Sequence, residues 1–141
     1  METFLCGPSG GTGGNRFLDD ISVDLFIIAI QVWSGSYIDA IQLTFDDNST
    51  TEKHGGSGGS PWVTPAFLPG ERVIELSGSY GDYIDSLTIR TTLQTFPALG
   101  GGGGGKEFRY HIPDNMHIAG LFGASGSYLD ALGVFYRQFP A

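Results

Sequence analysis

A five-residue pattern recurs three times along the chain. It reads glycine, any residue, tyrosine, a branched aliphatic residue and aspartate, and its copies end at Asp39, Asp85 and Asp130. The aspartates lie 46 and then 45 residues apart, and glycine runs repeat every 45 residues at 10–14, 55–59 and 100–105. Two unrelated motifs that share one period indicate an internal threefold repeat. The chain is therefore expected to fold from three similar units.

The segments that follow the three tyrosines have the alternating pattern of β-strands. Residues 37–45, 83–91 and 128–136 place apolar side chains at every second position, which predicts strands with one buried face. No segment shows a sustained helical period, and 23 glycines with 7 prolines disfavour long helices. The chain is expected to be all-β. Equivalent apolar residues two positions after each aspartate are expected to meet at a threefold core axis: Ile41, Leu87 and Leu132.

The length of 141 residues predicts a single domain, 1–141, that can bury a core of its own. Small sheets are stable only where their apolar faces meet, so three sheets should pack around a common axis. A propeller usually needs at least four blades, which disfavours that architecture. A hairpin is expected at residues 113–115. The repeat borders are expected at residues 1–14 with 106–141, 15–59 and 60–105.

The composition excludes several classes of partner. A formal net charge of −8 without a basic cluster disfavours nucleic acid, and no apolar run is long enough for insertion into a membrane. The three histidines lack the spacing of metal ligands, so neither a metal nor another cofactor is expected. No targeting segment is visible, which leads to the expectation of a cytoplasmic protein or one released without a signal peptide.

The repeated loops have the chemistry of a sugar site. An ionised aspartate accepts hydrogen bonds and can hold two neighbouring hydroxyl groups. Glycines let backbone amides approach a ligand closely, and tyrosine supplies a flat wall with a polar tip. Because these groups suit a hexose, the pattern predicts up to three shallow carbohydrate sites. In the middle copy Asp82 replaces the serine of the other two, which adds a second negative charge near Asp85.

These motifs resemble those of the jacalin-related lectins of the mannose-binding type, over nearly the whole chain from Gly10 to Tyr136. The resemblance implies a β-prism I fold of three four-stranded Greek-key sheets with pseudo-threefold symmetry. It also implies that mannose and high-mannose N-glycans, including those of glycoproteins, are bound with multivalent avidity. The implied site residues form three groups, which are Tyr37, Ile38 and Asp39 with Gly59; Tyr83, Ile84 and Asp85 with Gly104; and Tyr128, Leu129 and Asp130 with Gly14.

Other interpretations of the same motifs remain open at this point. The aspartates could instead stabilise tight turns in a structural or protein-interaction domain, such as a β-trefoil. Glycoside hydrolysis needs two carboxyl groups about 5–9.5 Å apart around one bond, whereas the repeat predicts one aspartate in each site. No catalytic residue is therefore expected, and the chain is predicted not to be an enzyme. A homodimer, formed for example by exchange of the first strand, is left undecided.

Overall fold

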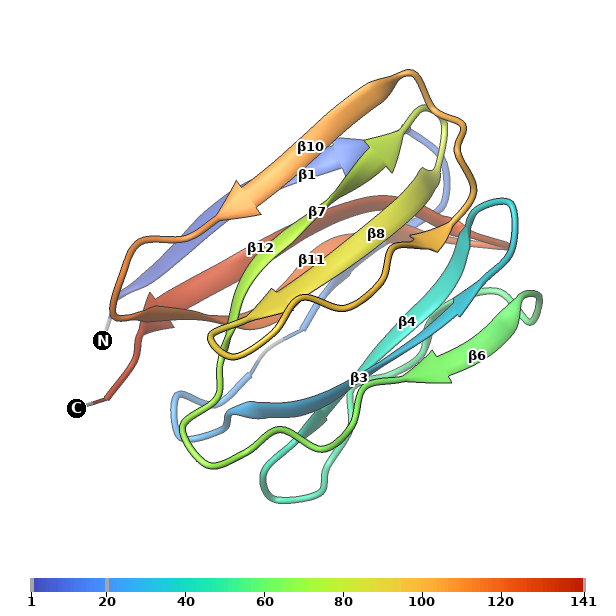
Figure 1. The fold of residues 1–141 in the computed structure, drawn as a ribbon. Coiled ribbons are helices and arrows are strands. Elements are labelled where there is room, and N and C mark those ends of the chain that lie inside the picture. The colour runs from blue at the N-terminus through green and yellow to red at the C-terminus, as the bar shows by residue number, and fades with distance from the viewer. Residues whose placement is uncertain (1, 20, 141) are drawn as a thin grey trace.

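The computed structural model describes residues 2–19 and 21–140, and within them twelve strands form three antiparallel four-stranded sheets (Figure 1). No helix among these residues is long and apolar enough to cross a membrane. The all-β prediction is confirmed. Sheet I contains, in spatial order, β1 (Thr3–Gly10), β12 (Leu129–Gln138), β11 (Met116–Ser125) and β2 (Asn15–Leu18). Sheet II contains β5 (His54–Gly55), β4 (Ile38–Phe45), β3 (Ile27–Ser34) and β6 (Ser60–Val63). Sheet III contains β9 (Leu99–Gly100), β8 (Ile84–Thr91), β7 (Val73–Tyr80) and β10 (Lys106–His111).

All three sheets have the same Greek-key path. Two central strands form a hairpin, an outer strand pairs with the second of them, and a glycine loop connects this outer strand to the opposite edge of the same sheet. In sheets II and III the outer strand follows the hairpin and has two residues, whereas in sheet I the eight-residue β1, the glycine loop and β2 come first in the chain. In sheet II, for example, β5 pairs with β4 and β6 pairs with β3. The loop must therefore pass over the end of the hairpin, where the repeated tyrosine-to-aspartate segment lies. This path brings together two motifs that are well separated in the sequence.

The core lies where the three sheets meet. β4, β8 and β12 contact one another pairwise, as expected of the innermost strands around a threefold axis. Ile41, Leu87 and Leu132 are each fully buried there, which confirms their predicted place. Because the described strands form three separate sheets, they do not make the closed barrel of a β-trefoil.

A β-bulge at each aspartate breaks the predicted alternation. Ser34 pairs with Ile38 and Trp33 pairs with Ala40, so Asp39 is an extra residue without a partner on β3. The same shift occurs at Asp85 and at Asp130. A bulge bends a strand and redirects a side chain. As a result Ile38 and Ile41 are both fully buried, although strict alternation would place them on opposite faces.

Two expected features differ from the structure. The sheet borders lie beyond the expected repeat borders, because β2, β6 and β10 each return to the sheet that precedes the glycine loop. Residues 113–115 do not close a hairpin, since β10 belongs to sheet III and β11 to sheet I. The turn instead carries the chain from one sheet to the next. Both differences arise from long-range pairing at the sheet edges, which a local pattern does not encode.

Candidate functional site

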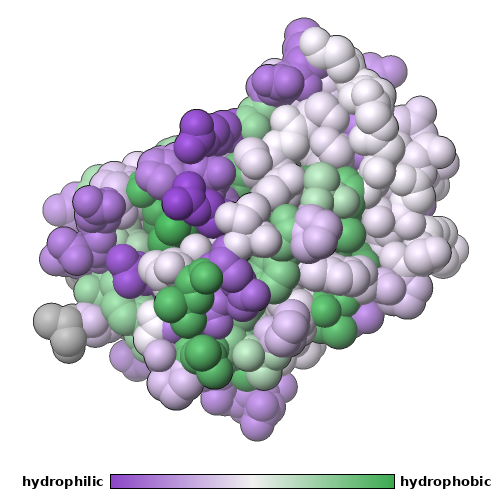
Figure 2. Space-filling view, viewed as in Figure 1, coloured by the Kyte–Doolittle hydropathy of each residue, from purple (hydrophilic) through white to green (hydrophobic). Residues whose placement is uncertain are grey.

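The three glycine loops and the three aspartate turns gather at one end of the prism. This end is on the right in Figure 1, opposite the two chain termini. In the same orientation Figure 2 shows it mostly in the pale colours of intermediate hydropathy. We call it the loop end and the opposite one the terminal end. The loop end therefore holds all of the residues that the repeated motifs predict for a site.

Each glycine loop is hydrogen-bonded to the bulge that it covers. The second glycine of the loop donates its N–H to the backbone carbonyl of the aspartate, over 2.9 to 3.0 Å in all three units. The donor and acceptor pairs are Gly56 with Asp39, Gly101 with Asp85, and Gly11 with Asp130. Because the bond is the same three times, loop and aspartate are held in the same relative position in every unit.

Two glycines of each loop lie directly against the carboxylate. A Cβ at Gly58 would be 2.8 Å from Oδ2 of Asp39, and a Cβ at Gly59 would be 2.7 Å from its Oδ1. Gly103 and Gly104 lie likewise against Asp85, and Gly13 and Gly14 against Asp130. Any side chain at these positions would displace the carboxylate. The structure thus brings together the predicted partners Gly59, Gly104 and Gly14 with their aspartates.

The last glycine of this pair also needs a left-handed backbone. Its φ angle is 80° at Gly59, 107° at Gly104 and 78° at Gly14, a region that glycine adopts without strain. Within the described part of the chain, the amides of these three glycines donate no hydrogen bond. Each of the three loops therefore presents a donor beside a carboxylate acceptor.

Burial changes the titration of the three carboxyl groups. Asp39, Asp85 and Asp130 are only 7%, 5% and 5% exposed, and this burial raises the pKa of each above its ordinary value. The Gly81 amide opposes the rise at Asp85, and the charge of Asp82 adds to it. Oδ1 of Asp130 is buried and accepts no hydrogen bond from the described residues. Such an acceptor would be satisfied by a donor from a ligand.

Each site is completed by the turn of the next unit. A hollow of about 360 Å³ beside Asp39 is lined by its own loop and by the turn Gly126 to Tyr128. A second hollow, of about 390 Å³ beside Asp85, includes Tyr37 as well as Tyr83. Tyr128 thus lines the hollow at Asp39, and Tyr37 lines the hollow at Asp85 together with Tyr83. This arrangement arises because the second glycine of each loop packs tightly against the backbone of a neighbouring turn. A Cβ on that glycine would overlap a backbone carbonyl oxygen of the turn. The glycine and the residue that carries the carbonyl are Gly56 and Ser127, Gly101 and Ser36, and Gly11 and Asp82.

The remaining predicted residues have other positions. Tyr37, Tyr83 and Tyr128 contact one another at the axis, with ring centroids 4.7 to 5.1 Å apart. Ile38, Ile84 and Leu129 are fully buried, so only their backbone can line a site. Sequence reasoning missed the second loop glycine against each carboxylate, that is Gly13, Gly58 and Gly103. Their fixed place one residue before Gly14, Gly59 and Gly104 was a usable signal.

The units are also joined immediately beside the loops. His54, which precedes the loop 55–59, stacks on Phe17 at 3.7 Å between ring centroids and pairs with Asp19 through Nε2 and Oδ1 at 2.7 Å. The equivalent seam between sheets III and I is closed by the Tyr110 hydroxyl, which donates to Ser9 at 2.6 Å. These contacts join neighbouring sheets at the base of the glycine loops and so stabilise the loops. Among the described residues, no group of three His, Cys, Asp or Glu side chains could hold a metal ion.

The fold and the repeated site define the class of protein, a β-prism with one carboxylate-and-glycine site in each sheet. Residues 6–135 match the family model described as Jacalin-like lectin domain, and the chain belongs to this family.

Individual relatives agree with this assignment. The mannose/glucose-specific lectin of Parkia platycephala is 34% identical over 146 residues, which cover 95% of this chain but only 32% of that lectin. The chain thus spans about a third of the length of this relative. Griffithsin from Griffithsia sp. is 33% identical over 131 residues, covering 92% of this chain and 94% of griffithsin. Among solved structures, Malaysian banana lectin superposes with a TM-score of 0.85 at 32% identity, covering 97% of this chain and 99% of that one.

Proposed function

We propose that the chain binds mannose and high-mannose N-glycans, free or on glycoproteins, through three equivalent shallow sites at the loop end. The observation that carries this proposal is the threefold pairing of a buried carboxylate with glycines whose amides point to no acceptor among the described residues. Each aspartate accepts hydrogen bonds from two adjacent sugar hydroxyls, and the loop amide donates to a sugar oxygen. Mannose is favoured because the Parkia relative is named a mannose/glucose-specific lectin.

The proposal is of binding without catalysis. Each of the three buried aspartates lies under its own loop, whereas glycoside hydrolysis needs two carboxyl groups around one bond. Asp82 lies near Asp85, but its side chain is exposed to solvent and does not enclose a bond together with Asp85. A single site of this kind holds a monosaccharide weakly, and millimolar affinity corresponds to about −4.1 kcal/mol. Three sites on one face can engage several branches of one glycan, which strengthens binding by on the order of 10²–10⁴-fold.

The test is a titration of single and double aspartate variants with methyl α-mannoside and with a branched high-mannose glycan. Asp130→Asn keeps the shape of the side chain but replaces one acceptor by a donor, so affinity at that site should fall by at least about 1 kcal/mol. Double variants that leave one site should bind the branched glycan no more than a few fold better than the monosaccharide.

Unfolding midpoints of the variants serve as the control, because the substitutions should leave the fold intact. Unchanged affinity for the branched glycan after two sites are removed would contradict avidity. Failure of the wild-type chain to bind any mannoside would favour the alternative, a domain that recognises protein.

A further inference from the structure

The hollow beside Asp85 differs from the hollow beside Asp39 in the charge of its lining. Asp82 and Asp85 both line the former, which measures about 390 Å³, together with Tyr37 and Tyr83. Its other lining residues are glycines, so no described residue of the lining carries a positive charge. Two carboxylates from one turn thus share a hollow that supplies them with no cation.

The charges of these two carboxylates act on each other. The side chain of Asp82 is exposed, whereas Asp85 is only 5% exposed. Burial raises the pKa of Asp85, the Gly81 amide opposes the rise, and the charge of Asp82 adds to it. Like charges this close disfavour each other's ionised form, and a cation beside them would stabilise both. The Asp85 site therefore favours a positively charged ligand over a neutral one.

The two tyrosines indicate what kind of cation fits. The rings of Tyr37 and Tyr83 meet edge to face, with centroids 5.1 Å apart and planes at 67° to each other. The face of a tyrosine ring attracts an ammonium group within about 6 Å of its centroid. A hard metal ion such as Ca²⁺ instead takes about six to eight oxygen ligands, and no such group of side chains exists among the described residues. Carboxylates beside aromatic rings therefore favour an organic ammonium group.

The Asp39 hollow has one carboxylate where the Asp85 hollow has two. It measures about 360 Å³, and its lining combines Asp39 and Tyr128 with Ser57, Ser127 and three glycines. In the motif that ends at Asp39, Ser36 stands at the position that Asp82 has in the motif ending at Asp85. The Asp39 site is thus a matched comparison in which a hydroxyl replaces the second carboxylate.

The backbone holds residues 36 and 82 in the same way. A Cβ on Gly11 would overlap the carbonyl oxygen of Asp82, and a Cβ on Gly101 would overlap that of Ser36. Each of the two turns is therefore packed tightly against a glycine loop. Because the surroundings of the backbone match, the two side chains can be exchanged without a change in either turn.

We infer that the Asp85 site selects an amino sugar, that is a hexose with a free ammonium group, which lies beside both carboxylates and against the tyrosine rings. This inference rests on the proposed function, because Asp85 and the Gly104 amide hold the sugar ring as at the other two sites. The ammonium group donates charge-assisted hydrogen bonds to Asp82 and Asp85, which are stronger than those of the hydroxyl that it replaces. N-acetylation removes the charge, so the preference is for free hexosamines and not for their N-acetylated forms.

The experiment compares methyl α-mannoside with its 2-amino and 6-amino analogues on two single-site proteins, by calorimetric or NMR titration. Asp39→Asn with Asp130→Asn leaves the Asp85 site, and Asp85→Asn with Asp130→Asn leaves the Asp39 site. At about pH 6 the amino groups are protonated and the aspartates are ionised. The affinity of the better amino glycoside relative to methyl α-mannoside should be about fivefold higher at the Asp85 site than at the Asp39 site. Added salt should reduce this difference.

Exchange of one side chain tests the cause of the preference. Asp82→Ser in the protein that keeps Asp85 should abolish it, and Ser36→Asp in the protein that keeps Asp39 should create it. Binding of methyl α-mannoside shows that each variant is folded. An equal ratio at the two sites, or a preference that survives Asp82→Ser, would overturn the inference and leave the proposed function intact. Absence of methyl α-mannoside binding from both single-site proteins would instead refute the proposed function.

Discussion

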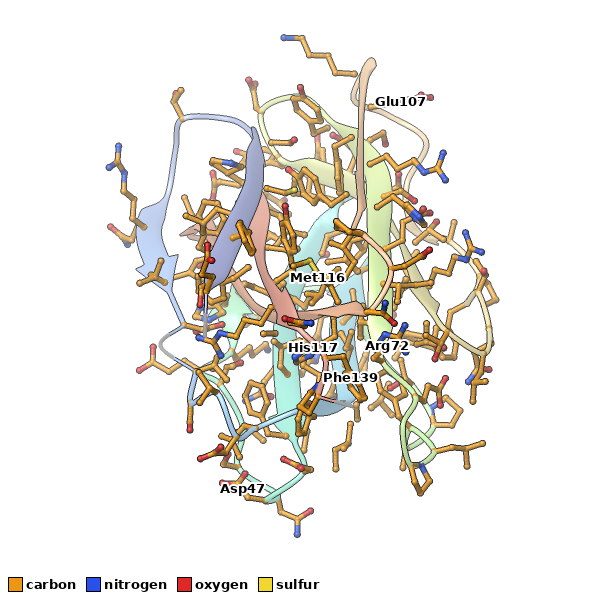
Figure 3. All side chains as sticks on the ribbon, turned by 90° about the vertical axis from the view of Figure 1, so that its left-hand side faces the viewer. Asp47, Arg72, Glu107, Met116, His117 and Phe139 are labelled. Carbon is orange, nitrogen blue, oxygen red and sulfur yellow. The ribbon has the colours of Figure 1, made fainter. Side chains whose placement is uncertain are left out.

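The two ends of the prism differ in how closely the three units agree. At the loop end, the same glycine-to-aspartate hydrogen bond and the same bulge occur in all three. At the terminal end, the contacts are irregular, and Figure 3 shows Arg72, Met116, His117 and Phe139 clustered there. The loop end depends on positions where only glycine or aspartate has the required geometry. The terminal end only has to close the core, which many combinations of side chains can do.

The cluster at the terminal end joins sheet I to the chain that enters sheet III. Nε of Arg72 donates to the Met116 carbonyl at 3.0 Å, and its guanidinium lies 5.2 Å from the centroid of the Phe139 ring. His117 packs edge-on against Phe139 at 5.3 Å, and the amide of Phe139 donates to the Asn115 carbonyl at 2.7 Å. These contacts stabilise the fold and lie far from the proposed sugar sites.

The two ends also differ in the titratable groups that they bury, which are acidic at the loop end and basic at the terminal end. Burial raises the pKa of the three aspartates at the loop end, whereas at the terminal end it lowers the pKa of His117, to about 4, with help from the positive charges of Arg137 and Arg72. Both ends therefore disfavour the ionised form, and they respond to acid in opposite ways.

The largest expected effect is on stability in acid. The folded-state pKa of His117 lies below the unfolded value, so between about pH 6.5 and 4 the unfolded chain binds a proton that the folded chain does not. The free energy of unfolding should fall by about 3 kcal/mol over that window. His117→Gln should remove this part of the slope in urea unfolding measured from pH 4 to 7.5.

His111, a half-exposed histidine at the end of β10, offers a matched control. His111→Gln should keep the acid-dependent loss that His117→Gln removes. If His117→Gln lost stability with pH as steeply as the wild type, burial of a neutral histidine would not be the cause.

A smaller effect is expected from adding one methyl group at either end. Gly59 and Gly70 both have a φ angle of 80°, but a Cβ at Gly70 would meet nothing within 4 Å, whereas one at Gly59 would meet Asp39. Alanine should cost roughly 1–2 kcal/mol of backbone strain at both positions. Gly59→Ala should in addition weaken mannose binding at the Asp39 site by more than about tenfold.

Binding should be measured with Asp85→Asn and Asp130→Asn present, so that only the Asp39 site contributes. Gly70→Ala should leave this affinity as it was. The comparison fails if Gly59→Ala binds mannose as tightly as Gly70→Ala.

The smallest effect concerns a single exposed charge at the loop end. Burial raises the pKa of Asp85, the Gly81 amide opposes this, and Asp82 adds a further rise. Asp82→Ser should therefore lower the pKa of Asp85 and extend its sugar binding to more acidic pH, with a change of about twofold or less at pH 7. Carboxyl ¹³C NMR titration would measure this directly.

The reciprocal variant is Ser36→Asp, which places the same charge before Asp39. It should raise the pKa of Asp39. Identical titration of Asp39 in both proteins would show that solvent fully screens a charge at this position.

Much of the site was predictable because the repeat supplied the same signal three times. One glycine-rich loop is ambiguous, but three at one period with three aspartates paired Gly14, Gly59 and Gly104 with the correct carboxylates. The bulge at each aspartate was not predictable, because the extra residue is defined only by its pairing with a partner strand. The contribution of Tyr128, from another unit, to the hollow at Asp39 was likewise not predictable, because it depends on how the units pack against one another.

By itself, the sequence determined the threefold repeat, the strands and the chemistry of the loops, because each of these depends on neighbouring residues and their period. The tertiary structure alone decided which sheet edge each outer strand joined and which turn completed each site. These outcomes depend on contacts between residues far apart in the chain. Trp33, Ser79 and Ala124, for example, occupy equivalent positions in the three sheets, which is apparent only from the strand pairing.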